Sequence, residues 1–338
     1  MASEHDDGPR GDASRGWGDR WLRLKWRVMD GVLELKGALP SGLFRSRRNG
    51  LGYAFLLPGV ILVGFLFAGM VLLLQYSFLT YDPYEFIIYE YTLENWVEAL
   101  TNDAFRTVFL RTLKLSLVVT VLSVVFGFPY AYLTVRAESE LLRKLLLAGV
   151  FVPFFTGTIV RAYGWLIILG KRGLVNSVAT GLGTGRVDVF GTETAVVIGL
   201  FQLMLPFAIL MLVPAIRTID RSLERAAVSL GADRLRTFRY VVVPLSKPGI
   251  TAASIVVFTI SMANFAIPWF LGAGTVDFMA NFIHSILLRS SNYPLASALS
   301  VALVMVTSTI VLAVFYFVGA GTMGLTVEED TIQGGGGQ

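Results

Sequence analysis

Few side chains in this sequence have the chemistry that an active site requires. The 338-residue chain has no cysteine, which excludes a disulfide framework, a thiolate nucleophile and a cysteine-ligated metal site. It has two histidines: His5 lies in the polar N-terminal tail, His284 lies between two apolar segments, and neither has a cysteine nearby. We therefore predict no catalytic residue, no metal site and no enzymatic activity.

A glycine-rich stretch, GLGTGR at 181–186, is the candidate for phosphate binding. A phosphate-binding loop also needs a Lys-Ser or Lys-Thr pair after its last glycine, and this stretch lacks that pair. We interpret it as an ordinary loop. The chain itself is not expected to hold a cofactor or to hydrolyse ATP by that route.

The composition is that of a protein that spans a membrane. Hydrophobic residues make up 54% of the chain and charged residues only 15%, whereas soluble domains have about 25% charged residues. A helix needs about 20 mostly apolar residues to cross the hydrocarbon layer, where backbone groups must bond to one another. Six segments predict an all-α integral membrane protein with six transmembrane helices: Ala54–Ser77, Leu115–Thr134, Leu145–Leu169, Ala195–Ala215, Thr251–Leu271 and Ala296–Val318.

Ionisable residues are almost absent from these six segments. Carriers driven by a proton or sodium gradient usually place such groups inside the bilayer, where they mark the path of the coupling ion. Here the segments contain no Asp, Glu or Lys, and Arg161 is their single charged residue. Arg161 can either face a pore or be satisfied by snorkelling or by a bond to another helix. Energy for transport is therefore expected from outside this chain.

The basic residues predict the orientation of the chain in the membrane. Ten Lys and Arg residues precede the first segment and seven lie in 217–247, whereas 80–110 carries six acidic residues and one Arg. By the positive-inside rule, both termini and the 217–247 loop are cytoplasmic. Lys171 and Arg172 go against the rule, because this assignment places them outside.

A transmembrane domain at 51–323 is expected between two cytoplasmic tails, 1–50 and 324–338. Within the first tail, 20–36 mixes Trp and Leu with Arg and Lys, which predicts an interfacial helix on the membrane surface; the alternative is a solvated tail. The last twelve residues, VEEDTIQGGGGQ, are typical of a flexible tail.

The loop at 218–248 is polar and rich in arginine, and it has a helical pattern of its own. Asp220 or Ser222 caps a first helix, and Gly231 ends it by taking up a left-handed conformation. Apolar residues recur along this helix at three- and four-residue spacing: Leu223, Ala226, Ala227 and Leu230.

A second helix is predicted directly after the first. Asp233 caps it, and Pro244 and Pro248 end it before the fifth apolar segment. Three residues form its apolar face: Leu235, Phe238 and Val242. The two helices make a compact basic knob that suits either of two surfaces. It can lie among lipid headgroups, or it can dock into a groove of a cytoplasmic partner, where small alanines permit close approach.

The same stretch resembles the EAA loop of the permease subunits of ABC importers. That pattern is Glu-Ala-Ala, three residues, Gly, and then an apolar-Pro ending; Ala226, Ala227 and Gly231 match it, and VVVPLSKPGI at 241–250 supplies the prolines. Arg225 departs from the pattern, because the family has its glutamate there, although Glu224 lies beside it. The resemblance implies that this coupling loop, 218–248, seats in a groove of an ATPase through seven residues: Glu224, Arg225, Ala226, Ala227, Gly231, Ala232 and Pro244.

Other stretches resemble the spermidine/putrescine-type branch of this family: YTLENWVEAL at 91–100, FGFPYAYLTVRA at 126–137, VRAYGWLIILGKRGLVNSV at 160–178 and AIPWFLGAGTVDFMANFIHSI at 266–286. The resemblance runs from about residue 54 to residue 320. It implies a type I ABC importer permease fold in a bacterial inner membrane. The implied partners are a second, homologous permease, two cytoplasmic ATPase subunits that bind the ATP, an extracytoplasmic solute-binding protein and membrane lipid, but no nucleic acid.

The branch also implies a polyamine as the transported solute, and polyamines favour carboxylates and aromatic faces along their path. Candidate residues for such a path are Arg161, Tyr163, Trp165, Asn264, Trp269 and Asp277. Arg161 would instead suit an opine or an amino-acid-like carboxylate, which related importers carry. A self-sufficient secondary carrier or channel is the alternative function. A structural membrane anchor is a third, and the Gly- and Pro-bearing segments argue against it.

Overall fold

A computed structural model describes the backbone of residues 50–316 and the side chains of residues 56–316. The interfacial helix expected at 20–36 and the C-terminal tail expected at 324–338 lie outside these residues. The chain divides into two units, 1–69 and 70–338. Helix α2 (Gly50–Tyr76) begins in the first unit, and the side chains of its large apolar residues there are exposed.

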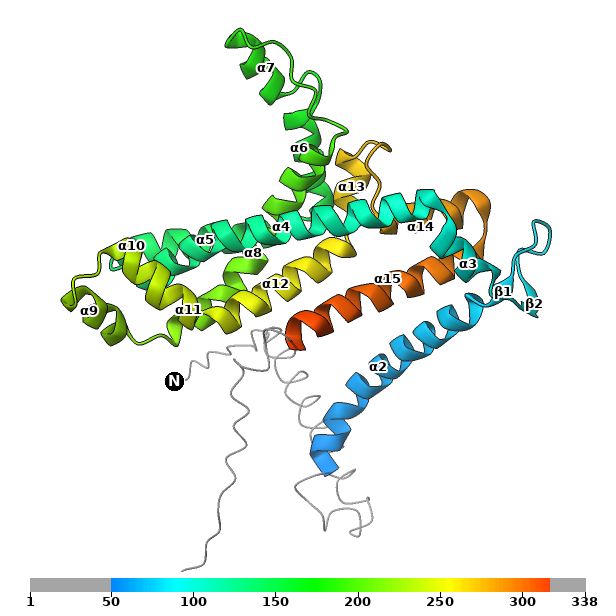
Figure 1. The fold of residues 1–338 in the computed structure, drawn as a ribbon, viewed down its shortest axis with the longest axis horizontal. Helices are drawn as coiled ribbons and strands as arrows, with labels where there is room; N and C mark the ends of the chain where they lie inside the picture. The colour runs from blue at the N-terminus through cyan, green and yellow to red at the C-terminus, as the bar shows by residue number, and fades with distance from the viewer. Residues whose placement is uncertain (1–49, 317–338) are drawn as a thin grey trace, which may run out of the picture. The chain divides into compact units, whose positions relative to one another are not determined.

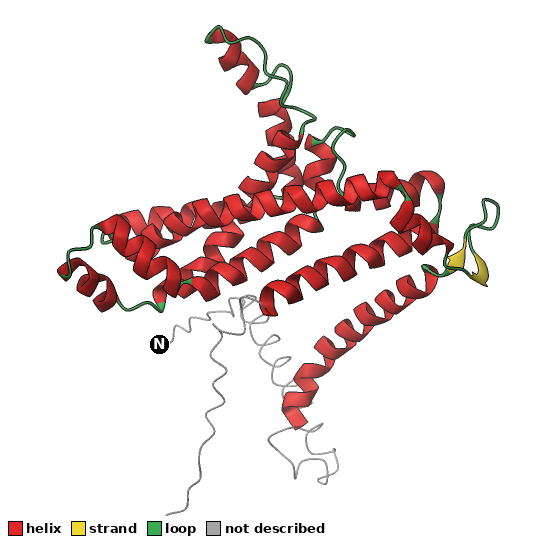
Figure 2. Ribbon diagram, in the orientation of Figure 1, coloured by secondary structure: helices red, strands yellow, loops and turns green. Residues whose placement is uncertain are grey.

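Three helices pack together as the core of the second unit, and a fourth lies beside them: α4 (Asp103–Arg136), α8 (Glu193–Arg217), α12 (Lys247–Met262) and α15 (Tyr293–Val314). This bundle is visible in Figure 1, and Figure 2 shows that most of the described residues are helical. Residues that are no more than 2% exposed fill its centre: Leu115 and Val119 of α4, Leu200 and Met204 of α8, and Val257 of α12.

The two ends of the bundle carry the shorter elements (Figure 1). One end has the strands β1 (Leu79–Thr80) and β2 (Ile88–Tyr91), helix α3 (Glu94–Thr101), helix α14 (Met279–Ser285) and the π-helix η2 (Ile286–Ser290). The opposite end has the coupling loop, formed by α9 (Arg221–Ser229), α10 (Arg234–Thr237), the π-helix η1 (Phe238–Val242) and α11 (Val243–Leu245). The strands are antiparallel, with Leu79 opposite Tyr91 and Thr80 opposite Ile88.

Two of the six predicted spans are broken rather than continuous. The third becomes α5 (Glu140–Phe155) followed by α6 (Thr158–Leu169) and α7 (Leu174–Gly181), with a bend of 100° after α5. The break falls at Thr156 and Gly157, both poor helix formers, and α6 and α7 point away from the bundle (Figure 1).

The fifth predicted span ends early, at Met262, and α13 (Ala266–Leu271) follows as a separate helix. Pro268 cannot donate the backbone hydrogen bond that a continuous helix would need at this point. Asn264 instead accepts a hydrogen bond from the backbone N–H of Ile267, at 3.1 Å, and so starts α13.

The start of α12 also differs from the prediction. Pro248 lies in its first turn and Pro244 in the first turn of α11, so the prolines begin helices instead of ending one. The segment Arg234–Leu245 is bent by 70° relative to α12. Among the described residues, four helices are long and apolar enough to cross a membrane, or up to six if each of the two bent pairs is one span.

The close packing of α12 on α8 depends on a missing side chain. Gly249 of α12 is buried, and a Cβ atom placed on it would overlap the Cβ atom of Ala215 in α8. Small residues at such crossings let helix backbones approach closely in membrane proteins. The contact joins the end of α8 to the start of α12, the two helices that the coupling loop connects.

Candidate functional site

Helix α9 of the coupling loop has both of the ends that its sequence predicts. The Asp220 carboxylate accepts a hydrogen bond from the backbone N–H of Ser222, at 2.8 Å. This bond lowers the pKa of Asp220, so the cap is present at neutral pH and is lost as the pH falls through that lowered pKa. At the other end Gly231 has a φ of +88° and donates to the carbonyl of Val228, while Ala232 donates to that of Ala227. This pair of bonds is a Schellman motif, which glycine permits.

Helix α9 is exposed except on the side of Glu224 and Ala227, and its exposed residues include small, apolar and basic ones. Arg225, Ala226 and Gly231 are exposed, whereas Ala227 and Ala232 are half-buried. Three large apolar residues beside them are also exposed: Leu223 at 47%, Val228 at 55% and Leu230 at 90%. Apolar side chains this exposed on a short helix are typical of a surface that a protein partner or a membrane covers.

Glu224 does not belong to that exposed face, although the sequence grouped it with the ATPase contacts. Its carboxylate lies 2.5 Å from Nη2 of Arg136 and accepts a hydrogen bond of 2.8 Å from the hydroxyl of Tyr132. Tyr132 and Arg136 lie on one face of α4, because they are four residues apart. Tyr132 and Arg136 were not among the predicted site residues; their four-residue spacing at the end of an apolar segment was the available signal.

The second half of the coupling loop packs on the same helix. Asp233 caps α10 by accepting from the backbone N–H of Arg236, at 2.6 Å, as predicted. The Phe238 ring of η1 lies 5.3 Å from the Phe128 ring and 5.2 Å from the Tyr132 ring, both on α4. Leu235 is not part of this buried face, because it is 72% exposed. Pro244 is also exposed.

The candidate residues on α6 lie apart from the coupling loop. Trp165 donates from its ring nitrogen to Oε1 of Gln202 in α8, at 3.4 Å, and the ring of Tyr163 lies 4.9 Å from that of Phe270 in α13. Arg161 is half-buried, and its Nε has no hydrogen-bond partner within residues 50–316. Gln202 is a polar residue inside a predicted span that the sequence analysis did not select.

Trp269 and Asp277 line one pocket, which has a volume of about 360 Å³. Its other lining residues come from the following loop, α14 and η2: Gly274, Asn281, Phe282, Ser285 and Arg289. Neither Asp277 nor Arg289 has an ion-pair or hydrogen-bond partner in the described part of the chain. The Trp269 ring lies 5.2 Å from that of Phe265 and 5.5 Å from that of His284. Asn264 does not line the pocket; its side chain accepts the hydrogen bond from the backbone N–H of Ile267.

The loop beside this pocket is tied to α4, and α4 is in turn paired with the start of α8. The backbone N–H of Met279 donates to the Thr112 hydroxyl, at 2.9 Å, and Nη1 of Arg111 donates to the carbonyl of Thr275, at 3.2 Å. Glu193, at the start of α8, lies 2.7 Å from Nζ of Lys114. The N-terminal part of α4 therefore holds this loop by direct bonds.

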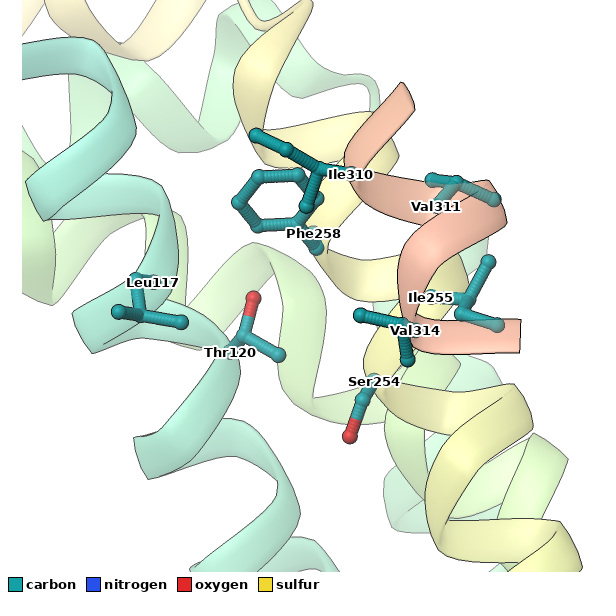
Figure 3. Close-up of a pocket in the computed structure, with 8 residues that line it drawn as sticks. All are labelled: Leu117, Thr120, Ser254, Ile255, Phe258, Ile310, Val311 and Val314. Carbon is teal, nitrogen blue, oxygen red and sulfur yellow. The ribbon is translucent and has the colours of Figure 1, made fainter. Parts of the chain in front are cut away.

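A second pocket, shown in Figure 3, is apolar and lies between α4, α12 and α15. It has a volume of about 90 Å³ and is lined by Leu117, Thr120, Ser254, Ile255, Phe258, Ile310, Val311 and Val314. No charged residue lines it, so it does not suit a charged solute. The described residues also contain no group of three or more His, Cys, Asp or Glu side chains that could hold a metal ion.

This chain is similar in sequence and in fold to known transport proteins. The profile of the family "Binding-protein-dependent transport system inner membrane component" matches residues 117–320. The chain is 35% identical to the "Spermidine/putrescine transport system permease protein PotB" of Haemophilus influenzae, over 76% of this chain and 88% of that protein. It is 32% identical to the protein of the same name from Escherichia coli K12, over 74% and 91%.

The fold also matches a solved structure, that of a bacterial alginate ABC transporter in complex with an alginate pentasaccharide-bound periplasmic protein. The TM-score is 0.67 at 23% sequence identity, over 83% of this chain and 98% of the other. This likeness shows the fold, and the sequence matches show the family. The chain belongs to the family of binding-protein-dependent transport system inner membrane components, the permease subunits of ABC importers.

Proposed function

We propose that this inner-membrane permease forms half of the translocation pathway of an ATP-driven importer whose solute is a polyamine. The observation that carries the coupling part is the exposed face of α9, where alanines and large apolar side chains stand at the surface of a capped helix. Such a face fits the groove of a partner better than water.

The proposed assembly has a second, homologous permease, two cytoplasmic ATPase subunits that bind the ATP, and a solute-binding protein outside. This chain would cross the inner membrane six times, with each bent pair counted as one span and both termini in the cytoplasm. The charge distribution supports this topology: seven Lys and Arg residues lie in 217–247, and six acidic residues lie in 80–110. The ATPase subunits, and not this chain, would bind and hydrolyse the ATP.

The mechanism follows from where the coupling loop is attached. ATP binding closes the two ATPase subunits, and the groove that holds the coupling loop moves with them. Because the loop joins α8 to α12 directly, its displacement tilts both helices and opens the pathway to the outside. The free energy comes from nucleotide binding, since a two-state shift requires a ligand that favours one state.

The polyamine assignment has support from two directions. The curated relatives named above are spermidine/putrescine permeases, and the pocket beside α13 offers an unpaired carboxylate, Asp277, next to the aromatic Trp269. An ammonium group is stabilised by both. Arg289 in the same pocket and Arg161 on α6 favour a solute that also carries a carboxylate, such as an opine, which is the second candidate.

The source of energy is tested in proteoliposomes that contain this permease, its partner permease and the ATPase, with the solute-binding protein added outside. Uptake should require ATP inside the vesicles, should be blocked by vanadate and should be insensitive to an uncoupler. Uptake by the permease alone, driven by an ion gradient, would instead identify a secondary carrier.

The solute class is tested by changing the two charges of the pocket separately. With putrescine or spermidine as solute, Asp277→Asn should raise the KM roughly two- to fivefold, because a partly exposed ion pair contributes up to about 1 kcal/mol. Arg289→Gln should lower the KM or leave it unchanged. Glu90→Gln, at an exposed acid on β2 outside the pocket, is the matched control. The reverse pattern, with Arg289→Gln weakening uptake of an opine, would replace the polyamine assignment.

A further inference from the structure

The coupling loop is bonded to α4 as well as being continuous with α8 and α12. Glu224 of α9 pairs with Arg136, at 2.5 Å, and accepts from the Tyr132 hydroxyl, at 2.8 Å. The same guanidinium donates from Nη2 to the carbonyl of Ile219, at 2.8 Å, in the segment before α9. The side chains of Arg136 and Glu224 are each 14% exposed, so the pair is largely shielded from water.

The second half of the loop contacts α4 independently of this ion pair. The Phe238 ring meets the rings of Phe128 and Tyr132, and Val242 beside it is 0% exposed. Tyr132 therefore touches both halves of the loop, through its hydroxyl on one side and its ring on the other. The loop cannot move relative to α4 without breaking an ion pair and opening an aromatic cluster.

We propose that α4 moves together with α8 and α12 when the coupling loop is displaced. In this proposal Arg136 is the positioning residue that holds α9 against α4. The proposal rests on the proposed function, because it assumes that an ATPase grips the exposed face of α9. Removing one partner of a shielded ion pair leaves an uncompensated charge, which is costly. Displacement of α9 therefore carries α4 with it, in addition to α8 and α12.

The experiment distinguishes two defects: loss of ATPase binding to the coupling loop, and loss of the movement that the bound ATPase passes to the helices. In the assembled transporter, Arg136→Glu and Glu224→Arg each place like charges together, and the double variant restores an ion pair. Three quantities are measured: the amount of ATPase that co-purifies, the rate of solute uptake, and the ATP hydrolysed per solute imported. Lys144→Ala is the matched control, because it breaks the exposed Glu140–Lys144 pair on the same side of the bundle, at 2.8 Å and 69% exposure for both side chains.

Each single variant should retain the ATPase but lose uptake about tenfold, with more ATP hydrolysed per solute, and the double variant should recover most of the uptake. A purely structural pair would lower the protein level without changing the ATP-to-solute ratio. If the single variants do not insert, Tyr132→Phe provides the measurement, because it removes one hydrogen bond and keeps the ring. It should raise the ATP-to-solute ratio about threefold.

Two results would overturn the inference. One is an unchanged ATP-to-solute ratio in the variants that insert. The other is uptake by the double variant that is as low as expected if the losses of the two single variants simply combine. Neither result contradicts the proposed function. That function fails separately, if the wild-type permease neither co-purifies with an ATPase nor needs ATP for uptake.

Discussion

Replacing Gly231 with proline should reduce ATP-driven uptake to less than about a tenth of the wild-type rate. Gly231 has a φ of +88°, which proline cannot adopt because its ring fixes φ near −65°. Proline would also lose the hydrogen bond that Gly231 donates to Val228. The end of α9 would unwind, and the exposed face that the ATPase is proposed to grip would lose its shape. Uptake and co-purified ATPase are the measurements.

Two substitutions at and near this position sharpen the test. Gly231→Asn should retain most of the activity, because asparagine tolerates the left-handed conformation. Ala227→Asp should abolish uptake as well, since it adds a charge at the half-buried edge of the docking face, three residues after Glu224. Ser139→Asp is its control: Ser139 caps α5 and is exposed, and Asp is an equally good cap. Normal uptake by both the Gly231→Pro and the Ala227→Asp variants, with the protein inserted, would refute the coupling role.

Replacing Gly249 with alanine should destabilise the permease by about 1–3 kcal/mol, the usual range for an overpacked contact. The added methyl group would overlap Cβ of Ala215 and push α12 away from α8. The measurement is the midpoint of thermal unfolding in detergent, compared with that of the wild-type protein.

A compensating change tests the cause of that loss. Adding Ala215→Gly to Gly249→Ala moves the methyl group from α8 to α12 and should recover a large part of the lost stability. Gly164→Ala, where no atom lies within 4 Å of the added Cβ, should have little effect. Equal losses in the single and the double variant would show that the contact between the two helices is not the cause.

Local signals in the sequence were sufficient to predict the caps of the coupling loop. Asp220, Asp233 and Gly231 act on backbone groups two or three residues away, so their side-chain chemistry determines the outcome. The apolar segments likewise predicted where the long helices lie. Their ends were less certain, because α4 continues well beyond the apolar residues that indicated it.

The breaks in the third and fifth segments could not be read from hydropathy, because the residues on both sides of each break are equally apolar. Asn264 followed by Pro268 was a usable signal for the second break. The pairing of Glu224 with Arg136 required knowledge of which helix the coupling loop packs against. That knowledge is tertiary, since the two residues lie far apart in the chain.

Helix α4 has 34 residues, which corresponds to about 51 Å of helix, whereas the hydrocarbon layer is about 30 Å thick. One end, near Arg111 and Thr112, holds the segment around Thr275 and Met279, and the other end holds Glu224. A single helix thus contacts the segment beside the charged pocket at one end and α9 of the coupling loop at the other. In the proposed importer, binding of solute outside and binding of nucleotide inside would therefore act on opposite ends of the same helix.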